Sequence, residues 1–218
     1  STDLSGNVSL QRWWELSSGF LRALSFMHRN DWIHGDIKPD NVRLRSPETN
    51  GPLDPVLLDL GLSRREHFPA EEKILGTPHT MAPEQWLGQP PDRRSDIYSA
   101  GVLLYHWWTG YFPFEEVSKP LLSSSHLHDE IPSISKRRLG LPPQVCDVLL
   151  RMLSKKPDDR YADGGEVLAD LSNALGYESW SEAENSESLI AQVSYAGTGE
   201  KSVSELLEPL LSWVGRRN

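Results

Sequence analysis

Residues 34–41, with the sequence HGDIKPDN, gather the side chains of this chain that are best suited to chemistry. Asp36 carries a carboxylate that can accept a proton from an alcohol. Two residues later, the Lys38 ammonium can neutralise the charge of a phosphoryl group during its transfer. The amide oxygen of Asn41 suits a divalent cation, and Pro39 limits how far the loop can flex. Together these residue types predict a site for phosphoryl transfer to a hydroxyl group.

The same octapeptide resembles the catalytic loop of protein kinases, H-R-D-x-K-x-x-N, with Gly35 at the position where arginine is usual. A lysine two residues after the aspartate is the form found in serine/threonine kinases. The resemblance implies that Asp36 and Lys38 are the catalytic residues. It also implies that Lys38 and Asn41 bind the cofactor, with Asn41 as a ligand of Mg²⁺.

Two motifs further along the chain agree with this resemblance. Residues 59–61, DLG, directly follow a predicted strand and resemble the kinase D-F-G motif. This implies that Asp59 also holds Mg²⁺ and belongs to the ATP-binding residues. Residues 76–84, GTPHTMAPE, resemble the G-T-P-x-Y-M-A-P-E run that closes the kinase activation segment. By that resemblance, Thr77 should form hydrogen bonds towards Asp36 and Lys38.

Two charged residues are expected to hold this site in place. In kinases, the aspartate that matches Asp96 anchors the backbone of the catalytic loop. From the residues alone, Asp96 can also be read as the N-cap of a helix, and the two interpretations are compatible. Residues 157–160, PDDR, resemble the kinase K-x-P-x-x-R turn. The resemblance therefore implies an ion pair between Arg160 and Glu84 of the A-P-E motif.

The element that leads into the catalytic loop follows from hydrophobic periodicity. Apolar residues recur at helical spacing between Leu10 and Met27, which predicts a long amphipathic helix. Asn7 or Ser9 is suited to cap its first turn, and residues 30–31 should end it. The helix would then run directly into the loop that carries Asp36.

The remaining elements are shorter or more deeply buried. A helix beginning at Ser95 is apolar on nearly every face and should lie inside the protein. The other predictions are strands at 42–44 and 56–58, helices from 143 and over 163–174, and at most two short helices within 115–141. The expected fold class is mainly α with short β-hairpins, and the resemblance implies the C-terminal lobe of a protein-kinase-like fold.

The composition of the chain changes after Gly176. Residues 1–176 hold all the motifs and are expected to form the larger lobe of a kinase, with the N-terminal lobe absent from the chain. Residues 177–218 are interpreted as an acidic linker and a C-terminal extension, with a strand at 189–196 and a helix at 203–214. The run at 196–202 fails the phosphate-loop pattern, so no nucleotide site is expected there.

Charge and cysteine content narrow the partners and the compartment. The formal net charge of −9 and the pI near 5.3 argue against a nucleic-acid partner. The single cysteine, Cys146, excludes an internal disulfide and fits a reducing, cytoplasmic location. No apolar run approaches the roughly 20 residues needed to cross a bilayer, so no membrane segment is expected in this chain.

The expected function is that of a serine/threonine kinase catalytic-domain portion, which transfers the γ-phosphate of ATP to Ser/Thr hydroxyls of a protein substrate. The Gly-rich loop and the strand lysine of kinases belong to the N-terminal lobe, which is therefore an expected partner, and the isolated chain should be inactive. Arg43 stands where kinases place an aliphatic residue beneath the adenine ring. The alternative is a pseudokinase or scaffold lobe that binds partners without catalysis.

Overall fold

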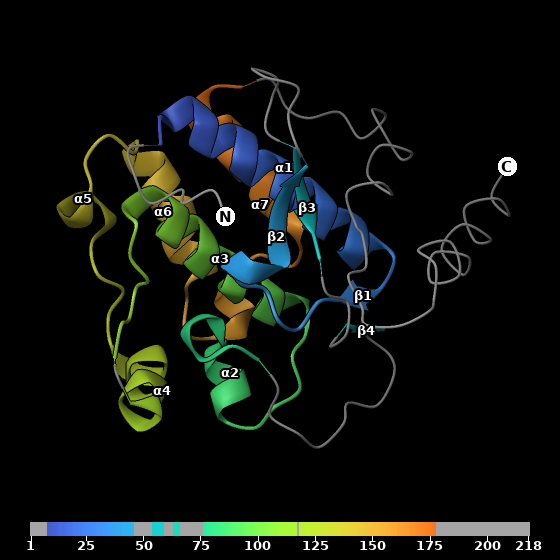
Figure 1. Cartoon of the computed structure of the whole chain (residues 1–218), viewed down its shortest axis with the longest axis vertical. Helices are drawn as coiled ribbons and strands as arrows, with labels where there is room; N and C mark the ends of the chain where they lie inside the picture. The colour runs from blue at the N-terminus through green and yellow to red at the C-terminus, as the bar shows by residue number, and fades with distance from the viewer. Residues whose placement is uncertain (1–7, 46–53, 59–62, 66–75, 117, 178–218) are drawn as a thin grey trace, which may run out of the picture.

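The computed structural model describes residues 8–45, 54–58, 63–65, 76–116 and 118–177. Within these ranges the fold is mainly helical, with short antiparallel strands at one side of the helices, as the fold-class prediction expected (Figure 1). The α-helices are α1 (Leu10–Arg29), α2 (Pro83–Trp86), α3 (Arg93–Thr109), α4 (Lys119–His128), α5 (Ile134–Arg137), α6 (Pro143–Met152) and α7 (Gly164–Leu175). The strands are β1 (Trp32–Ile33), β2 (Val42–Arg45), β3 (Asp54–Leu57) and β4 (Arg64–Arg65), and the 3₁₀ turns are η1 (Pro39–Asn41), η3 (Pro78–Thr80) and η4 (Pro157–Asp159).

Helix α1 covers the residues that the apolar periodicity and the capping residue predicted. Ser9 is the N-cap, and its hydroxyl accepts a hydrogen bond from the Arg12 backbone N–H at 3.2 Å. Asn30 is the C-cap, and Asp31 has a left-handed φ of 62° that turns the chain back. The prediction for this helix is therefore confirmed at both ends, with Ser9 rather than Asn7 as the cap.

Helix α3 lies at the centre of the molecule (Figure 1). Most of its residues are buried, including Tyr98, Leu103 and Tyr105, as its nearly uniform apolar pattern predicted. Its N-cap is Asp92, which exchanges hydrogen bonds with Ser95 in a capping box. The interpretation of Asp96 as the N-cap was wrong. Asp92 provides the cap one turn earlier, which leaves the Asp96 carboxylate available for another contact.

The strands make two small sheets beside α1. β2 and β3 pair antiparallel, with Val42 opposite Leu57, and β1 pairs antiparallel with β4. Leu57 is buried in the main core, and Val42 packs partly buried against that core. The hairpin prediction is confirmed for β2 and β3. Both strands extend one or two residues towards the turn beyond the predicted bounds, because backbone pairing continues past the last apolar residue. At its other end β3 stops at Leu57, one residue before the predicted end at Leu58.

Helices α1 and α7 approach each other unusually closely. At Gly164, the first residue of α7, an added Cβ would lie 2.9 Å from the backbone nitrogen of Ser25. Gly101 plays the same role between α3 and α6, where a Cβ would lie 2.9 Å from Met152. These glycines let the helices pack closely in two pairs, α1 with α7 and α3 with α6.

The predictions outside this core have mixed outcomes. Two helices, α4 and α5, fall within residues 115–141, as expected. The predicted strand at 189–196 and helix at 203–214 lie outside the described residues, and the division of the chain at residue 176 stays a prediction. Among the described residues, none of the helices has the length and apolar character needed to cross a lipid bilayer.

Candidate active site

The Asp36 carboxylate is held from both sides. The Lys38 ammonium lies 2.6 Å from Oδ2 of Asp36, and the Thr77 hydroxyl donates to Oδ1 at 2.8 Å. Asp36 is largely buried, with 8% of the residue exposed. The expected hydrogen bond from Thr77 to Asp36 is confirmed. Thr77 reaches Lys38 only through this carboxylate, because Lys38 donates to its other oxygen. A carboxylate has about four lone-pair sites, so it can still accept another proton donor.

Asn41 closes the loop around Asp36. Its Nδ2 donates to the backbone carbonyl of Asp36 at 2.8 Å, at the end of the 3₁₀ turn that Pro39 begins. Because a carbonyl can only accept, this bond fixes the amide orientation and leaves the Asn41 side-chain oxygen free to act as a ligand. The backbone N–H of Leu58 donates to the Asn41 carbonyl at 2.7 Å. This contact brings the end of β3 beside the loop.

The His34 side chain connects the catalytic loop to the end of β3. Its side chain is fully buried, and Nε2 lies 3.0 Å from the carbonyl of Leu58, so Nε2 carries the hydrogen. Nδ1 then accepts from the backbone N–H of Asp36 at 3.2 Å. The next residue, Gly35, has a φ of 79°, in the left-handed region where a side chain is strained. This backbone geometry favours glycine at the position where kinases usually carry arginine.

Asp96 anchors the backbone that precedes Asp36. Its Oδ2 accepts from the His34 N–H at 2.7 Å, and its Oδ1 accepts from the Gly35 N–H at 2.9 Å. The side chain is almost fully buried, at 1% exposure of the residue. Hydrogen bonds from backbone N–H groups to a buried carboxylate are stronger than neutral ones. The predicted anchoring role of Asp96 is therefore confirmed.

His28 completes this anchor and was missed in the sequence. Its Nδ1 accepts from the Gly164 N–H at 3.2 Å, so its Nε2 donates to Oδ2 of Asp96 at 3.1 Å. The ring is fully buried and connects the start of α7 to the catalytic loop through Asp96. The available signal was a histidine that occupies a core-facing position of the α1 pattern, one turn after Leu24.

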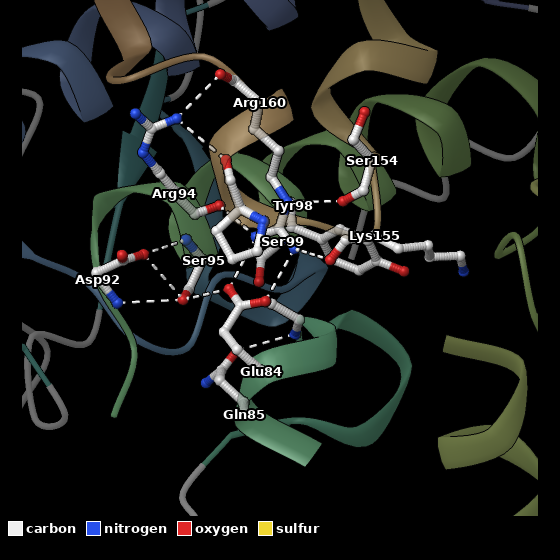
Figure 2. A network of polar contacts seen from close by, with 12 residues as sticks. Glu84, Gln85, Asp92, Arg94, Ser95, Tyr98, Ser99, Ser154, Lys155 and Arg160 are labelled. Carbon is white, nitrogen blue, oxygen red and sulfur yellow. Dashed lines mark hydrogen bonds and ion pairs between the residues drawn. The ribbon is translucent and has the colours of Figure 1, made fainter. Parts of the chain in front are cut away.

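Glu84 and Arg160 form a buried ion pair, as the resemblance implied (Figure 2). Arg160 NH1 and NH2 each lie 2.8 Å from one carboxylate oxygen of Glu84, in a bidentate arrangement. Burial by itself would raise the pKa of Glu84, but the hydrogen bonds and charge of Arg160, helped by the Ser95 hydroxyl, outweigh it and lower that pKa. Glu84 is therefore ionised throughout the neutral range.

Ser99 of α3 and Gln85 of α2, which lie beside this ion pair, hold the segment that follows Thr77 (Figure 2). The Ser99 hydroxyl donates to the carbonyl of Thr80 at 2.7 Å. Gln85 accepts from the Ala82 N–H at 2.9 Å and so caps the start of α2. Neither residue was singled out from the sequence. Small polar side chains within an otherwise apolar buried helix, as at Ser99, were the only signal of this role.

A second polar cluster lies where α4 meets the core. The Tyr98 hydroxyl is 2.9 Å from Nδ1 of His126, and the Lys155 ammonium donates to the His126 carbonyl at 2.8 Å. Burial, followed by the charges of Lys155 and His79, lowers the pKa of His126 to about 3. Burial also lowers the pKa of Lys155 to about 8, with the Arg160 charge acting in the same direction. His126 is thus a neutral, buried part of the fold.

Two residues that the sequence analysis singled out, Asp59 and Arg43, are not seen in contact with Asp36, Lys38 or Asn41. Asp59 lies outside the described residues, so its position relative to Asn41 stays a prediction. Arg43 is exposed on β2, and its cross-strand neighbour is Val56. Near the same loop, the hydroxyl of Ser63, just before β4, donates to the His34 carbonyl at 3.3 Å. The structure therefore brings together Asp36, Lys38 and Asn41, and it leaves Arg43 at the surface.

Comparison with known proteins agrees with this fold and loop geometry, which are those of the larger lobe of a protein kinase. Residues 5–170 match the family model described as protein kinase domain. The chain therefore belongs to the protein kinase family.

Curated relatives are serine/threonine kinases. The chain is 30% identical over 172 residues to a probable serine/threonine-protein kinase of Clostridium acetobutylicum, with 78% of this chain and 25% of that protein covered. It is 36% identical over 179 residues to serine/threonine-protein kinase pkn3 of Myxococcus xanthus, covering 74% and 32%. With PknB of Mycolicibacterium smegmatis it shares 32% over 170 residues, covering 76% and 27%. The chain thus spans about a quarter to a third of the length of these relatives.

Proposed function

We propose that this chain is the larger lobe of a serine/threonine kinase that transfers the γ-phosphate of ATP to serine or threonine hydroxyls of a protein substrate. The observation that carries the proposal is the geometry of Asp36. Its carboxylate is oriented by Thr77 at 2.8 Å and by Lys38 at 2.6 Å, and the residue is 8% exposed. A carboxylate so placed is suited to accept the proton of a substrate hydroxyl.

Lys38 and Asn41 then have distinct tasks. The Lys38 side chain is 22% exposed, and its ammonium now contacts Asp36. It would also neutralise the negative charge of a phosphoryl group that approaches Asp36. Asn41 would offer its free amide oxygen to Mg²⁺, and this oxygen donor fits the preference of that ion. Asp59 is proposed as the further Mg²⁺ ligand, because it follows Leu58, whose N–H is bound to the Asn41 carbonyl. When bound, Mg·ATP would supply the phosphoryl group, and Mg²⁺ would neutralise negative charge on the phosphates.

The test of the catalytic assignment is Asp36→Asn in the longer parent protein. The substitution keeps the shape and the acceptor for Thr77 but removes the base. A general base typically contributes about 10²–10⁴-fold to the rate, so transfer to a protein substrate should fall by at least that range while the melting temperature changes little. Asp40→Asn, on an exposed neighbouring residue, is the matched control and should retain activity. Near-normal turnover of the Asp36 variant would contradict the proposal.

The chain of residues 1–218 is expected to bind Mg·ATP weakly and to be inactive by itself. It contains the base and the candidate metal ligands, but a Gly-rich loop and a second phosphate-binding lysine would have to come from an N-terminal lobe. Isothermal titration with Mg·ATP, together with a phosphotransfer assay on a generic protein substrate, checks this expectation. Micromolar binding with turnover would show that this lobe is sufficient.

The exposed guanidinium of Arg43 favours one alternative, a pseudokinase or scaffold lobe. It lies two residues after Asn41, at the position where kinases place an aliphatic residue beneath the adenine ring. If the parent protein binds no Mg·ATP and Arg43→Leu restores binding, the scaffold function is the better description. Because an Arg stem can pack against a ring with its charge in solvent, we place the active kinase first. A cytoplasmic location is also proposed, from the single cysteine alone.

A further inference from the structure

An exposed basic and apolar surface lies where α5 leads into α6. Residues 136–139 read KRRL, and Leu139 is 81% exposed. The Arg137 guanidinium lies 5.3 Å from the centroid of the Tyr111 ring, which is itself 51% exposed. Lys136 is also exposed. We name the surface formed by Tyr111, Lys136, Arg137 and Leu139 the KRRL patch.

The KRRL patch is fixed to the start of α1 by its neighbour Arg138. The Arg138 guanidinium lies 4.2 Å from the centroid of the Trp108 ring and donates to the Trp108 carbonyl at 2.8 Å. Its other nitrogen donates to the carbonyl of Val8 at 2.6 Å. These contacts of Arg138 fix the backbone of the residues beside it, so the patch is held in one conformation against α3 and the start of α1.

The end of α7 lies at the same end of α1. Gly176 is the C-cap of α7, and the next residue, Tyr177, stacks on Trp14 with ring centroids 5.2 Å apart and planes 6° from parallel. Trp14 belongs to the second turn of α1, about 6 Å along the axis from Leu10. In Figure 1 the start of α1, the α5–α6 connection and the end of α7 lie at one side of the molecule. The chain therefore leaves α7 near the support of the KRRL patch.

The residues that follow Tyr177 complement the patch in charge and in apolar character. Residues 178–187 read ESWSEAENSE and contain four glutamates, one tryptophan and no basic residue. Ten residues can span roughly 33 Å when extended. The segment starts beside Trp14, and the support of the patch contacts Val8, so the two points are separated by about two turns of α1, which is much less than this reach. At the patch, Glu115 lies 3.7 Å from Arg137, so with Lys136 the surface keeps a net positive charge.

We propose that residues 178–187 bind the KRRL patch of the same chain, with glutamates facing Lys136 and Arg137 and Trp180 against Leu139. Each exposed ion pair is weak by itself. Several such contacts on a segment that is already tethered at Tyr177 benefit from an effective concentration in the millimolar range, which makes the bound state populated. The acidic segment then covers an apolar side chain that would otherwise stand in water and ties the end of α7 to the α5–α6 connection.

Hydrogen exchange of the full chain tests this proposal. The measurement follows backbone amides of residues 136–140 by mass spectrometry, at low salt and at about 1 M salt, where the screening length falls to about 3 Å. We expect the amides of the wild type to exchange several-fold more slowly at low salt than at high salt. This protection should be absent in Glu182→Lys/Glu184→Lys and also in Lys136→Glu/Arg137→Glu. The variant that combines all four changes should regain the protection. Glu205→Lys/Glu208→Lys makes the same charge change outside the segment and should leave exchange unchanged.

Three results would overturn the proposal. The first is equal exchange in the wild type and in both charge-reversed variants. The second is an equal effect of the Glu205/Glu208 control, which would indicate general charge rather than a docked segment. The third is protection that grows with protein concentration together with a dimeric mass, because the segment would then bind a second copy instead of its own chain.

Discussion

Arg160 holds both carboxylate oxygens of Glu84 at 2.8 Å, although the two residues are 76 positions apart in the sequence. The pair joins α2, at the end of the segment that carries Thr77, to the turn between α6 and α7 (Figure 2). Both side chains are buried, and Arg160 also donates to the carbonyls of Arg94, Ser154 and Lys155. One guanidinium thus satisfies four separate groups inside the lobe.

Removal of Arg160 should therefore be strongly destabilising. Arg160→Ala leaves the Glu84 carboxylate buried without its charge partner, and such losses cost on the order of 3–5 kcal/mol. Chemical denaturation of the purified chain measures the change in the free energy of unfolding. Arg151→Ala is the matched control, because Arg151 is half exposed and lies 3.7 Å from Asp170, where an ion pair contributes about 0–1 kcal/mol. An Arg160 variant as stable as the wild type would show that the pair is energetically unimportant.

Gly164 and Gly165 offer a sharp comparison at the start of α7. In Gly164→Ala the new Cβ would lie 2.9 Å from the Ser25 backbone nitrogen, which cannot move without shifting α1. Overpacking of this kind typically costs about 1–3 kcal/mol, and the N–H contact to His28 should weaken with it. In Gly165→Ala the closest atoms are the side-chain oxygens of Ser25 at 2.9 Å and of Asp163 at 3.0 Å, and both belong to side chains that can shift.

We therefore expect Gly164→Ala to lower the melting temperature and to speed amide exchange at His34 and Gly35, which Asp96 holds. Gly165→Ala should be close to neutral, since alanine gains about 1 kcal/mol in helix propensity over glycine. Equal effects of the two substitutions on stability and on exchange would contradict the close-packing argument.

Protonation of His126 should destabilise the fold in mild acid. Its pKa is lowered from 6.5 to about 3 in the folded chain, so the unfolded state binds a proton that the folded state excludes between these values. The free energy of unfolding should then decrease as the pH falls below about 6.5, by up to about 1.4 kcal/mol per pH unit from this group.

The check is denaturation of the wild type and of His126→Gln between about pH 4 and pH 7. Glutamine keeps an acceptor for Tyr98 but does not titrate, so the variant should show the shallower dependence on pH. Carboxylates such as Glu84 titrate in both proteins and cancel in the comparison. Identical pH dependence of the two proteins would mean that His126 is accessible to protons in the folded state.

The sequence alone predicted the elements that depend on local chemistry. The apolar period and the Ser9 cap define α1, and the spacing of Asp36, Lys38 and Asn41 along one loop indicates the chemistry of the site. The pairing of Glu84 with Arg160 was also predicted, but through resemblance to kinases and not from the residues themselves. These features could be predicted because each is carried by a short motif.

Tertiary structure decided which side chains support the loop. Asp96 could be read as a helix cap, and only the folded chain shows that Asp92 takes that role and frees Asp96 to bind His34 and Gly35. The His28 link to Asp96 depends on Gly164, more than a hundred residues away, reaching the same point in space. No local pattern records such a contact, because a hydrogen bond between distant segments is fixed by helix packing and not by the spacing of residues along the chain.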